Sequence, residues 1–289
     1  MKLSEVGESE LIRYLSREFD IDNKRVIKGI GDDASVTLQD NSKCLLTTTD
    51  ILVEGVHFSS SYTTPYLIGK KAVSISLSDI AAMGGQPTFL LVTLSLPSST
   101  PFEYLQNLYR GVSERAGEFG VLLTGGNTSS SPEKIVIGTV VLGEAPGDEV
   151  VYRRGATVGD TIYVTGQLGD SALGLLLLQS GTIDTKGISS DKAVMKHQNP
   201  VPRVKAGRLL AEKHLATAMI DISDGLMCDL RHITEASEVG AAISLHQLPL
   251  STQVKSRILK NPEDICLPLS GGEDYELLFT ASPSSASMI

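Results

Sequence analysis

The sequence predicts an α+β protein of two domains, and three observations carry that prediction. Segments with strand-like alternation are interleaved with segments whose apolar residues recur at helical spacing, in both halves of the chain. A length of 289 residues favours two domains over one. The composition changes near residue 145, at a Pro-Gly turn. We expect a mixed sheet with helices over residues 1–145 and an α/β sandwich over residues 146–289.

Composition and charge restrict the classes of function. A hydrophobic content of 41% and a charged content of 20% are typical of a soluble globular protein. A net charge of −9 argues against a nucleic-acid partner, which needs a basic face. The longest apolar run, residues 173–178, is too short to span a bilayer. The start lacks a signal-peptide core, and the scattered cysteines suggest no disulfide framework, so we expect a cytoplasmic protein without membrane contact.

The first half opens with a helix and an acidic turn. Apolar residues at helical spacing predict an amphipathic helix over residues 4–19. Gly31-Asp32-Asp33 then predicts a turn before a strand over residues 36–38. Adjacent carboxylates on a turn are usually solvated, so this turn alone does not indicate a site.

Residues 44–58 are the most informative stretch of the first half. The apolar run over residues 44–46 predicts a strand that ends in hydroxyls and a carboxylate. These are Thr47, Thr48, Thr49 and Asp50, and His57 follows on the same stretch. Such oxygen ligands suit Mg²⁺. An ordinary edge strand is the alternative, because Thr is a good strand former.

The helix predicted over residues 65–83 carries an acid on its apolar side. Asp79 falls on the same face as Ile68, Ala72 and Ile75, and neither Lys nor Arg lies one turn away. A carboxylate on a buried face is costly unless it is paired or bound to a metal. Asp79 therefore favours a metal site, with a buried carboxylate that accepts backbone amides as the alternative.

The rest of the first half leads to a pair of glycines. A strand is expected over residues 88–96, a helix from Pro101 to Gly120, and a buried strand over residues 121–123. That strand is expected to run into a loop that contains Gly125, Gly126 and Asn127. Glycines after a strand allow the backbone to approach a phosphate, although a glycine pair alone is weak evidence.

The second half repeats the pattern of strand, acidic or glycine turn, and helix. Helices are expected over residues 168–180 and 192–214, and an Arg pair at residues 153–154 suits a phosphate. Ser223 and Asp224 are expected to cap a helix. Asp221 lies inside an apolar strand, where capping does not explain it. A strand and turn over residues 241–250 and a strand after residue 274 complete this half.

Acids therefore accompany the ends of many predicted elements. They are Asp32, Asp33, Asp50, Asp79, Asp221, Asp224, Glu273 and Asp274. Gathered carboxylates repel one another unless divalent cations neutralise them. Metals that bridge phosphates fit phosphoryl transfer, where positioning and charge neutralisation do most of the catalytic work. The chain contains neither a Walker motif nor a kinase-type His-Arg-Asp motif.

Five segments together resemble the thiamine-monophosphate kinase family, part of the superfamily of aminoimidazole ribonucleotide synthetase and selenophosphate synthetase. They read Gly-Asp-Asp-Ala at 31–34, Thr-Thr-Asp at 48–50 with Gly-Val-His-Phe at 55–58, Ser-Asp-Ile-Ala-Ala-Met-Gly-Gly at 78–85, Asp-Ile-Ser-Asp-Gly-Leu at 221–226 and Ser-Gly-Gly-Glu-Asp-Tyr-Glu-Leu at 270–277. The resemblance covers residues 7 to about 280.

The resemblance implies ATP-dependent, Mg²⁺-assisted phosphorylation of thiamine monophosphate to thiamine diphosphate by direct in-line transfer. It implies several Mg²⁺ ions on Asp32, Thr48, Thr49, Asp50, Asp79, Asn127, Asp221 and Asp224. It implies ATP contacts from Gly126, Asn127, Arg153 and Ser223, and substrate contacts from His57 and Glu273. It also implies a homodimer whose N-terminal sheets pair, and assigns no residue as a general base.

Two departures from the family pattern bear on these expectations. Asn127 stands where the family has Asp, so the metal at that position is expected to bind more weakly. Family chains also continue beyond the position of Ile289 into a region with an aromatic residue on the thiamine ring, so the C-terminal domain is expected to be truncated. The alternatives are another ATP-using member of the superfamily, or a catalytically weak protein that binds nucleotides or thiamine phosphates.

Overall fold

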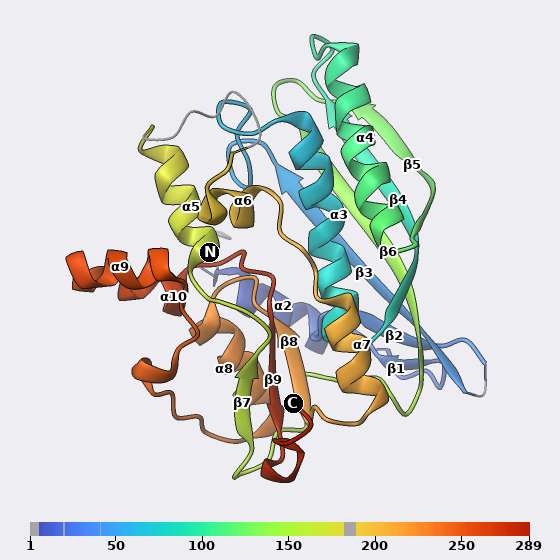
Figure 1. The fold of residues 1–289 in the computed structure, drawn as a ribbon. Coiled ribbons are helices and arrows are strands. Elements are labelled where there is room, and N and C mark those ends of the chain that lie inside the picture. The colour runs from blue at the N-terminus through green and yellow to red at the C-terminus, as the bar shows by residue number, and fades with distance from the viewer. Residues whose placement is uncertain (1–5, 20, 41, 182–188) are drawn as a thin grey trace.

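The computed structural model describes residues 6–19, 21–40, 42–181 and 189–289. In Figure 1 a six-stranded sheet runs down the right side and a three-stranded sheet lies at the lower left, and a long central helix packs on the first and reaches the second. Each half thus combines strands and helices, which confirms the mixed α/β class. The division into domains at residues 145–146 and the sandwich in the second half stay predictions.

The first sheet is mixed, as expected. Its strands are β1 (Val26–Lys28), β2 (Ser35–Leu38), β3 (Lys43–Val53), β4 (Gln86–Leu96), β5 (Leu122–Ser130) and β6 (Val136–Pro146). They are ordered β1-β2-β3-β6-β4-β5, with β4 and β5 parallel and every other pair antiparallel. Buried and half-buried residues alternate along β6, so one face of the sheet is turned to the core.

Three helices accompany this sheet: α2 (Glu8–Glu18), α3 (Pro65–Ala82) and α4 (Phe102–Glu118). Helix α3 begins where the Thr64 hydroxyl accepts the Leu67 N–H, and it ends before Gly84, whose φ of 71° suits glycine. Its residues are buried on nearly every side, because α4 and the sheet cover one flank and elements of the second half cover another.

The second half surrounds a small antiparallel sheet. Strands β7 (Thr161–Val164), β9 (Leu277–Ala281) and β8 (Ala218–Asp221) lie side by side in that order. The helices are α5 (Asp170–Gln179), α6 (Lys192–Gln198), α7 (Val204–Glu212), α8 (Leu226–Ser237), α9 (Thr252–Lys260) and α10 (Cys266–Ser270). One apolar core joins both halves, since Ile80 of α3 belongs to the same cluster as Met219 of β8 and Leu277 of β9.

Three local expectations were wrong. Strand β3 continues through the hydroxyls to Val53 instead of ending at them, because β6 pairs with its whole length. Residues 122–130 form one exposed strand rather than a buried strand and a loop, because β4 pairs on one side only. Residues 241–250 contain a 3₁₀ turn, Leu245–Gln247, where a strand was expected. The helix expected over residues 4–19 is found as α2, while residues 4 and 5 lie outside the described ranges.

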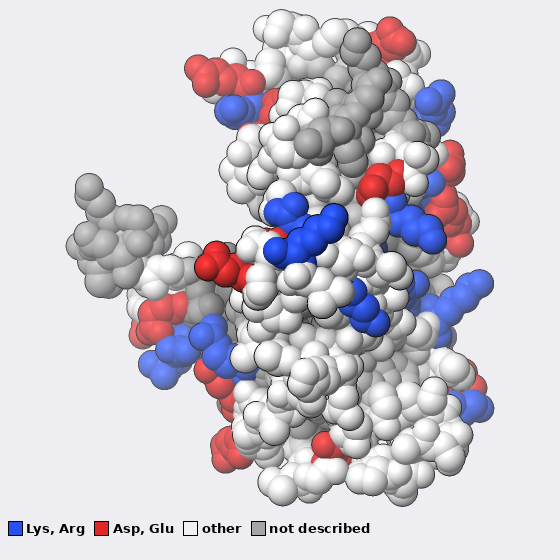
Figure 2. All heavy atoms as spheres, turned by 60° about the vertical axis from the view of Figure 1, so that its left-hand side comes forward, with Lys and Arg blue, Asp and Glu red and all other residues white. Residues whose placement is uncertain are grey.

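On the face shown in Figure 2, basic and acidic side chains are interspersed and much of the area is uncharged, so this face offers no continuous basic field. None of the helices in the described ranges combines the length and the apolar character that a bilayer crossing requires.

Candidate active site

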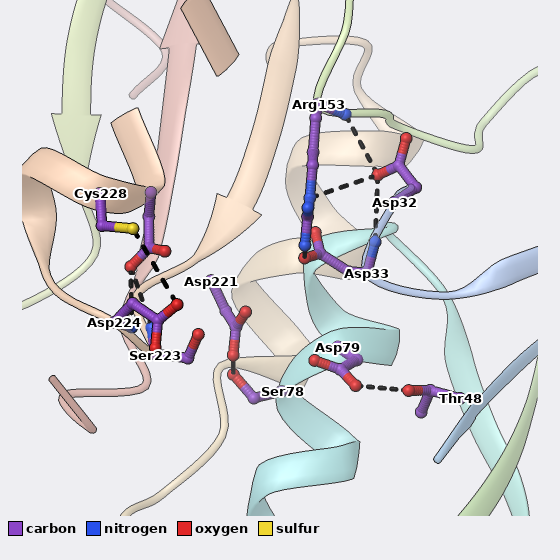
Figure 3. Close-up of polar contacts among 11 residues, drawn as sticks. Asp32, Asp33, Thr48, Ser78, Asp79, Arg153, Asp221, Ser223, Asp224 and Cys228 are labelled. Carbon is purple, nitrogen blue, oxygen red and sulfur yellow. Dashed lines mark hydrogen bonds and ion pairs between the residues drawn. The ribbon is translucent and has the colours of Figure 1, made fainter. Parts of the chain in front are cut away.

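Carboxylates from three distant parts of the chain meet where the two halves join. Asp33 lies on the turn before β2, Asp79 on the last turn of α3, and Asp221 at the end of β8. One oxygen of each lies within 4.8 Å of the others. Figure 3 shows these side chains pointing toward a shared space. We call these three residues, with Asp32 and Asp50, the carboxylate cluster.

Strand β3 contributes through its alternation. Thr48 and Asp50 point to the buried face, where the Thr48 hydroxyl donates to Asp79 Oδ2. Ser76 Oγ of α3 donates to Asp50 Oδ2 at 2.6 Å. Thr49 lies between them and is exposed, so its side chain faces away from the cluster. The strand therefore brings two of its three expected ligand side chains into the site.

Helix α3 supplies serines at alternate positions that hold the acids in place. Ser78 Oγ donates to Asp221 Oδ2 at 2.6 Å, across the junction between the two halves. Ser76 also contacts Thr139 Oγ1 of β6 at 2.7 Å, so the polar side of the helix is fully embedded. Such hydrogen bonds fix the orientation of side chains that would otherwise repel one another.

Burial and mutual repulsion raise the pKa values of the cluster. Burial raises the pKa of Asp33 to about 8 despite the neighbouring Arg153, and it raises the pKa of Asp221 to about 7. The pKa of Asp79 lies well above its usual range because of burial and then the charges of Asp50 and Asp221. The positively charged side chains near the cluster in the described ranges do not balance its carboxylates. The ionised cluster is therefore stable only if a further cation binds there.

Arg153 is the cation that reaches the cluster from the second half. Its Nε lies 3.2 Å from Asp33 Oδ1, and its backbone N–H donates to Asp32 Oδ1 at 3.3 Å. Figure 3 shows the guanidinium against these two acids on one side of the site. Arg153 thus neutralises one edge and leaves Asp79 and Asp221 without an ion-pair partner in the described ranges.

The donor set fits a hard divalent cation. Asp33 Oδ2 is buried and has no hydrogen-bond partner within the described ranges, although its other oxygen is paired with Arg153. A buried carboxylate oxygen without a partner costs free energy that a cation can repay. All available donors are carboxylate or hydroxyl oxygens, which are the ligands that Mg²⁺ prefers.

The pKa shifts predict how stability depends on pH without metal. Carboxyls whose folded pKa is raised stabilise the folded state most below the unfolded pKa of about 3.8, and that contribution is lost as the pH rises through 7 and 8. Between about pH 7.5 and 8.5, where ordinary histidines and acids have largely lost their protons, we expect the melting temperature in EDTA to fall. Mg²⁺ should reverse the fall, because it binds the ionised cluster of the folded state. Thermal melts with EDTA or Mg²⁺ measure this, and a flat or rising profile in EDTA contradicts it.

A second polar group joins the halves beside His57. Lys71 Nζ of α3 lies 2.9 Å from Glu273 Oε1 and donates to the His57 carbonyl at 3.3 Å. His197 Nδ1 lies 3.1 Å from Glu273 Oε2. Burial alone would raise the pKa of Glu273, but Lys71 and His197 outweigh it and lower it to about 2. The two expected substrate contacts, His57 and Glu273, therefore share one buried lysine.

The start of α8 differs from the expected cap. The N-cap residue is Gly225, and neither Ser223 nor Asp224 caps the helix. Instead, Asp229 Oδ2 accepts the N–H groups of Ser223, Asp224 and Gly225 at 3.1, 3.2 and 3.1 Å. Because Asp229 binds these N–H groups, the Asp224 carboxylate is not used for capping and stays exposed, at the edge of the site shown in Figure 3.

Gly126 and Asn127 make no polar contact with the carboxylate cluster in the described ranges. Both belong to the exposed strand β5, and no hydrogen bond or ion pair in the described ranges joins them to the carboxylates. Gly126 is required by packing, because a Cβ there would lie 1.8 Å from the Val92 carbonyl oxygen of β4. The close approach of β4 to β5 is therefore enough to explain a glycine at position 126, and no bound phosphate is needed to explain it.

Sequence reasoning missed three contributors. Asp33 was counted among the acids but not among the metal ligands, and only the fold shows that it faces Asp79. Lys71 is a buried cation within an apolar helix, a signal that the sequence did contain. Asp229 offered no sequence signal beyond its distance of one helical turn from the cap.

Comparisons with known proteins give a consistent result. Residues 31–145 match the family "AIR synthase related protein, N-terminal domain", and residues 157–288 match its C-terminal domain. Thiamine-monophosphate kinase of Buchnera aphidicola (subsp. Schizaphis graminum) is 37% identical over 96% of this chain and 84% of its own. That of Bacillus subtilis is 37% identical over 91% of this chain and 80% of its own. The structure "AaThiL complexed with AMPPCP and TMP" superposes with a TM-score of 0.86 at 37% identity, over 98% of this chain and 88% of that chain.

Proposed function

The chain belongs to the thiamine-monophosphate kinase family of AIR synthase related proteins, and we propose that it transfers the γ-phosphate of ATP to thiamine monophosphate. The products are ADP and thiamine diphosphate, so the enzyme acts in thiamine diphosphate biosynthesis. The relative whose structure is complexed with AMPPCP, an ATP analogue, and TMP supports both substrates.

The observation that carries the proposal is the carboxylate cluster with its unpaired oxygen. Asp32, Asp33, Asp50, Asp79 and Asp221, with Thr48, would hold Mg²⁺ ions, and Asp224 would hold a further one at the exposed edge. Bound Mg²⁺ supplies the positive charge that neutralises phosphate oxygens and brings two anions together. The Thr49 side chain faces away from the cluster, and no described contact joins Asn127 to it, so their roles as metal ligands stay predictions.

Residues of the chain itself would orient the metal-binding carboxylates and neutralise the nucleotide phosphates. Ser76 and Ser78 hold the carboxylates of Asp50 and Asp221, so little reorganisation is needed during transfer. Arg153 provides a fixed cation beside the cluster for the nucleotide phosphates. Gly126 of β5 and Ser223 beside α8 would contact the nucleotide.

No residue is needed as a general base. The acceptor is a phosphate monoester with a second pKa of about 6, so its attacking oxygen is already ionised near neutral pH. The ionised Glu273, fixed by Lys71, would face the cationic thiamine, and His57 would border the same substrate. Transfer is then a single in-line displacement, which inverts the configuration of a chiral γ-phosphate.

A steady-state assay with several acceptors tests the proposal. Purified protein with ATP and Mg²⁺ should convert thiamine monophosphate to thiamine diphosphate and leave unphosphorylated thiamine unchanged. Turnover of ATP with other superfamily substrates but not with thiamine monophosphate would favour a different branch. Tight binding of thiamine monophosphate without any turnover would identify a binding protein instead.

We also propose that the enzyme is a homodimer joined through β5. This strand is a free sheet edge whose residues are all exposed, and Leu122 and Leu123 are 61% and 39% exposed there. Ile51 of β3 and Phe89 of β4 are exposed on the same sheet. Long unpaired sheet edges are rare in monomers because they invite pairing with another chain, and a second copy would pair with this edge and cover its two exposed leucines.

Charged residues on this edge should separate the two copies. We expect Leu122→Glu combined with Leu123→Glu to change the mass in light scattering from twice 30.8 kDa to 30.8 kDa. The matched control is Leu259→Glu on α9, a leucine that is 85% exposed outside the sheet, and it should leave the mass unchanged. A double variant that keeps the wild-type mass, or a monomeric wild type, rejects the interface.

A further inference from the structure

A second group of possible metal ligands lies on the first turns of α8. Cys228, Asp229 and His232 each offer one ligand atom, a sulfur, a carboxylate oxygen and a ring nitrogen, and these atoms lie within 4.8 Å of one another. Positions 228 and 232 are one helical turn apart and therefore share a face. Cys228 and His232 are half-buried, so solvent cations can reach them.

One of these ligands is already fixed in place. Asp229 is buried, and its Oδ2 accepts three backbone N–H groups from the segment before α8. Its side chain therefore cannot swing away, which reduces the ordering cost of metal binding. The ring of His232 makes no hydrogen bond or ion pair within the described ranges and is available as a ligand.

This group is chemically unlike the carboxylate cluster. Mg²⁺ favours all-oxygen sites, whereas thiolate and imidazole together favour Zn²⁺ and similar transition metals. A Cys–His pair separated by one turn of helix, with a neighbouring carboxylate, supplies three ligands and leaves a fourth position for water.

We propose that Cys228, Asp229 and His232 bind a borderline-soft divalent cation such as Zn²⁺, at a site separate from the magnesium ligands, and that its occupancy inhibits the kinase. The Cys228 thiol gives its proton to solvent as the metal–sulfur bond forms. Donor atoms of a tetrahedral zinc site lie about 3.5 Å apart, so binding draws the Cys228 and His232 side chains toward the fixed Asp229 by small rotations.

The link to activity runs through Asp224. Cys228 Sγ lies 4.0 Å from Asp224 Oδ2, and Figure 3 shows the two side chains next to each other. A divalent charge on Cys228 attracts the Asp224 carboxylate and competes with the magnesium ion that Asp224 would hold. This inhibitory step rests on the proposed function, whereas the metal site itself does not.

Cobalt spectroscopy tests the site without any assay of activity. Co²⁺ added to the full chain in excess Mg²⁺ should produce a thiolate-to-cobalt charge-transfer band that Zn²⁺ removes. Cys228→Ser should abolish the band, and His232→Ala should weaken binding by at least about ten-fold. Cys266→Ser, which removes an exposed thiol elsewhere, is the matched control and should keep the band. Absence of the band in the wild type, or its survival in Cys228→Ser, overturns the site.

A second measurement needs no variant. Zn²⁺ should slow alkylation of Cys228 by iodoacetamide, read by peptide mass spectrometry, while Cys266 in the same sample reacts at an unchanged rate. Equal rates at Cys228 with and without Zn²⁺ overturn the site. In kinase assays, Cys228→Ser should raise the Zn²⁺ concentration for half-inhibition by about ten-fold or more. If the wild type lacks kinase activity, the proposed function fails, while the cobalt and alkylation results still decide the site.

Discussion

Asp79→Asn should lower kcat/KM for phosphoryl transfer by about 10³-fold or more, equivalent to about 4 kcal/mol of transition-state stabilisation. Asn keeps an oxygen that can accept from Thr48 but removes the negative charge that would hold a metal. The same change should raise the melting temperature of the metal-free protein at pH 8, because it removes a buried charge that repels Asp50 and Asp221. Asp50→Asn should likewise abolish turnover and its dependence on Mg²⁺.

A matched control separates this effect from the general cost of changing a buried acid. Asp264 is 8% exposed and pairs with Arg257 at 2.5 Å, outside the cluster. Asp264→Asn should lower stability and leave the kinetics unchanged. A wild-type rate with normal Mg²⁺ dependence in Asp79→Asn would refute the metal role of the cluster.

Lys71→Met should both destabilise the protein and weaken binding of thiamine monophosphate. It leaves Glu273 half-buried with His197 as its remaining ion-pair partner in the described ranges, and loss of one member of a buried pair costs about 3–5 kcal/mol. We expect the lower end of that range, since the Glu273 side chain is 24% exposed. The KM for thiamine monophosphate should rise while the KM for ATP stays the same, because Lys71 orients the substrate side of the site.

The pH dependence of this loss has a definite sign. A carboxyl whose folded pKa is lowered to about 2 stabilises the fold above its unfolded pKa of 4.5, and that contribution disappears as the pH falls toward 2. The difference in stability between wild type and Lys71→Met should thus be complete at neutral pH and shrink below pH 4.5. Denaturant titrations at several pH values measure it.

The neighbouring lysine provides the control. Lys70 is equally buried but pairs with Glu114 and Glu118, each at 2.8 Å, on the other side of α3. Lys70→Met should lower stability and leave the KM for thiamine monophosphate unchanged. If both variants raise that KM alike, Lys71 has no special link to the substrate.

The fold class and most elements could be predicted because local patterns determine them. The alternation of β6 and the capped apolar helix α3 are visible in the sequence and present in the structure. The strand expected over residues 241–250 failed because, in the described ranges, it pairs only through a single bridge from Leu250 to Leu168, and such pairing depends on the whole fold. The exposure of β5 could not be predicted for a similar reason, because the apolar residues at its start indicate a buried strand when the sequence is read alone.

The site could be predicted from residue types, but the contacts between its residues could not. Asp79 and Asp221 stood out as acids within apolar segments, and they do meet. The serines of α3, the lysine shared by His57 and Glu273, and the unpaired oxygen of Asp33 depend on contacts between segments far apart in sequence. No local period encodes such contacts, so only the packed structure identifies them.

The most direct test of the central claim is a single-turnover experiment with this protein, ATP and thiamine monophosphate, followed by ³¹P NMR. With Mg²⁺, we predict that ADP and thiamine diphosphate form in equal amounts without inorganic phosphate, and that EDTA stops both. Formation of ADP with inorganic phosphate in place of thiamine diphosphate, or transfer that continues undiminished in EDTA, would contradict the assignment of a magnesium-assisted kinase site to the carboxylate cluster.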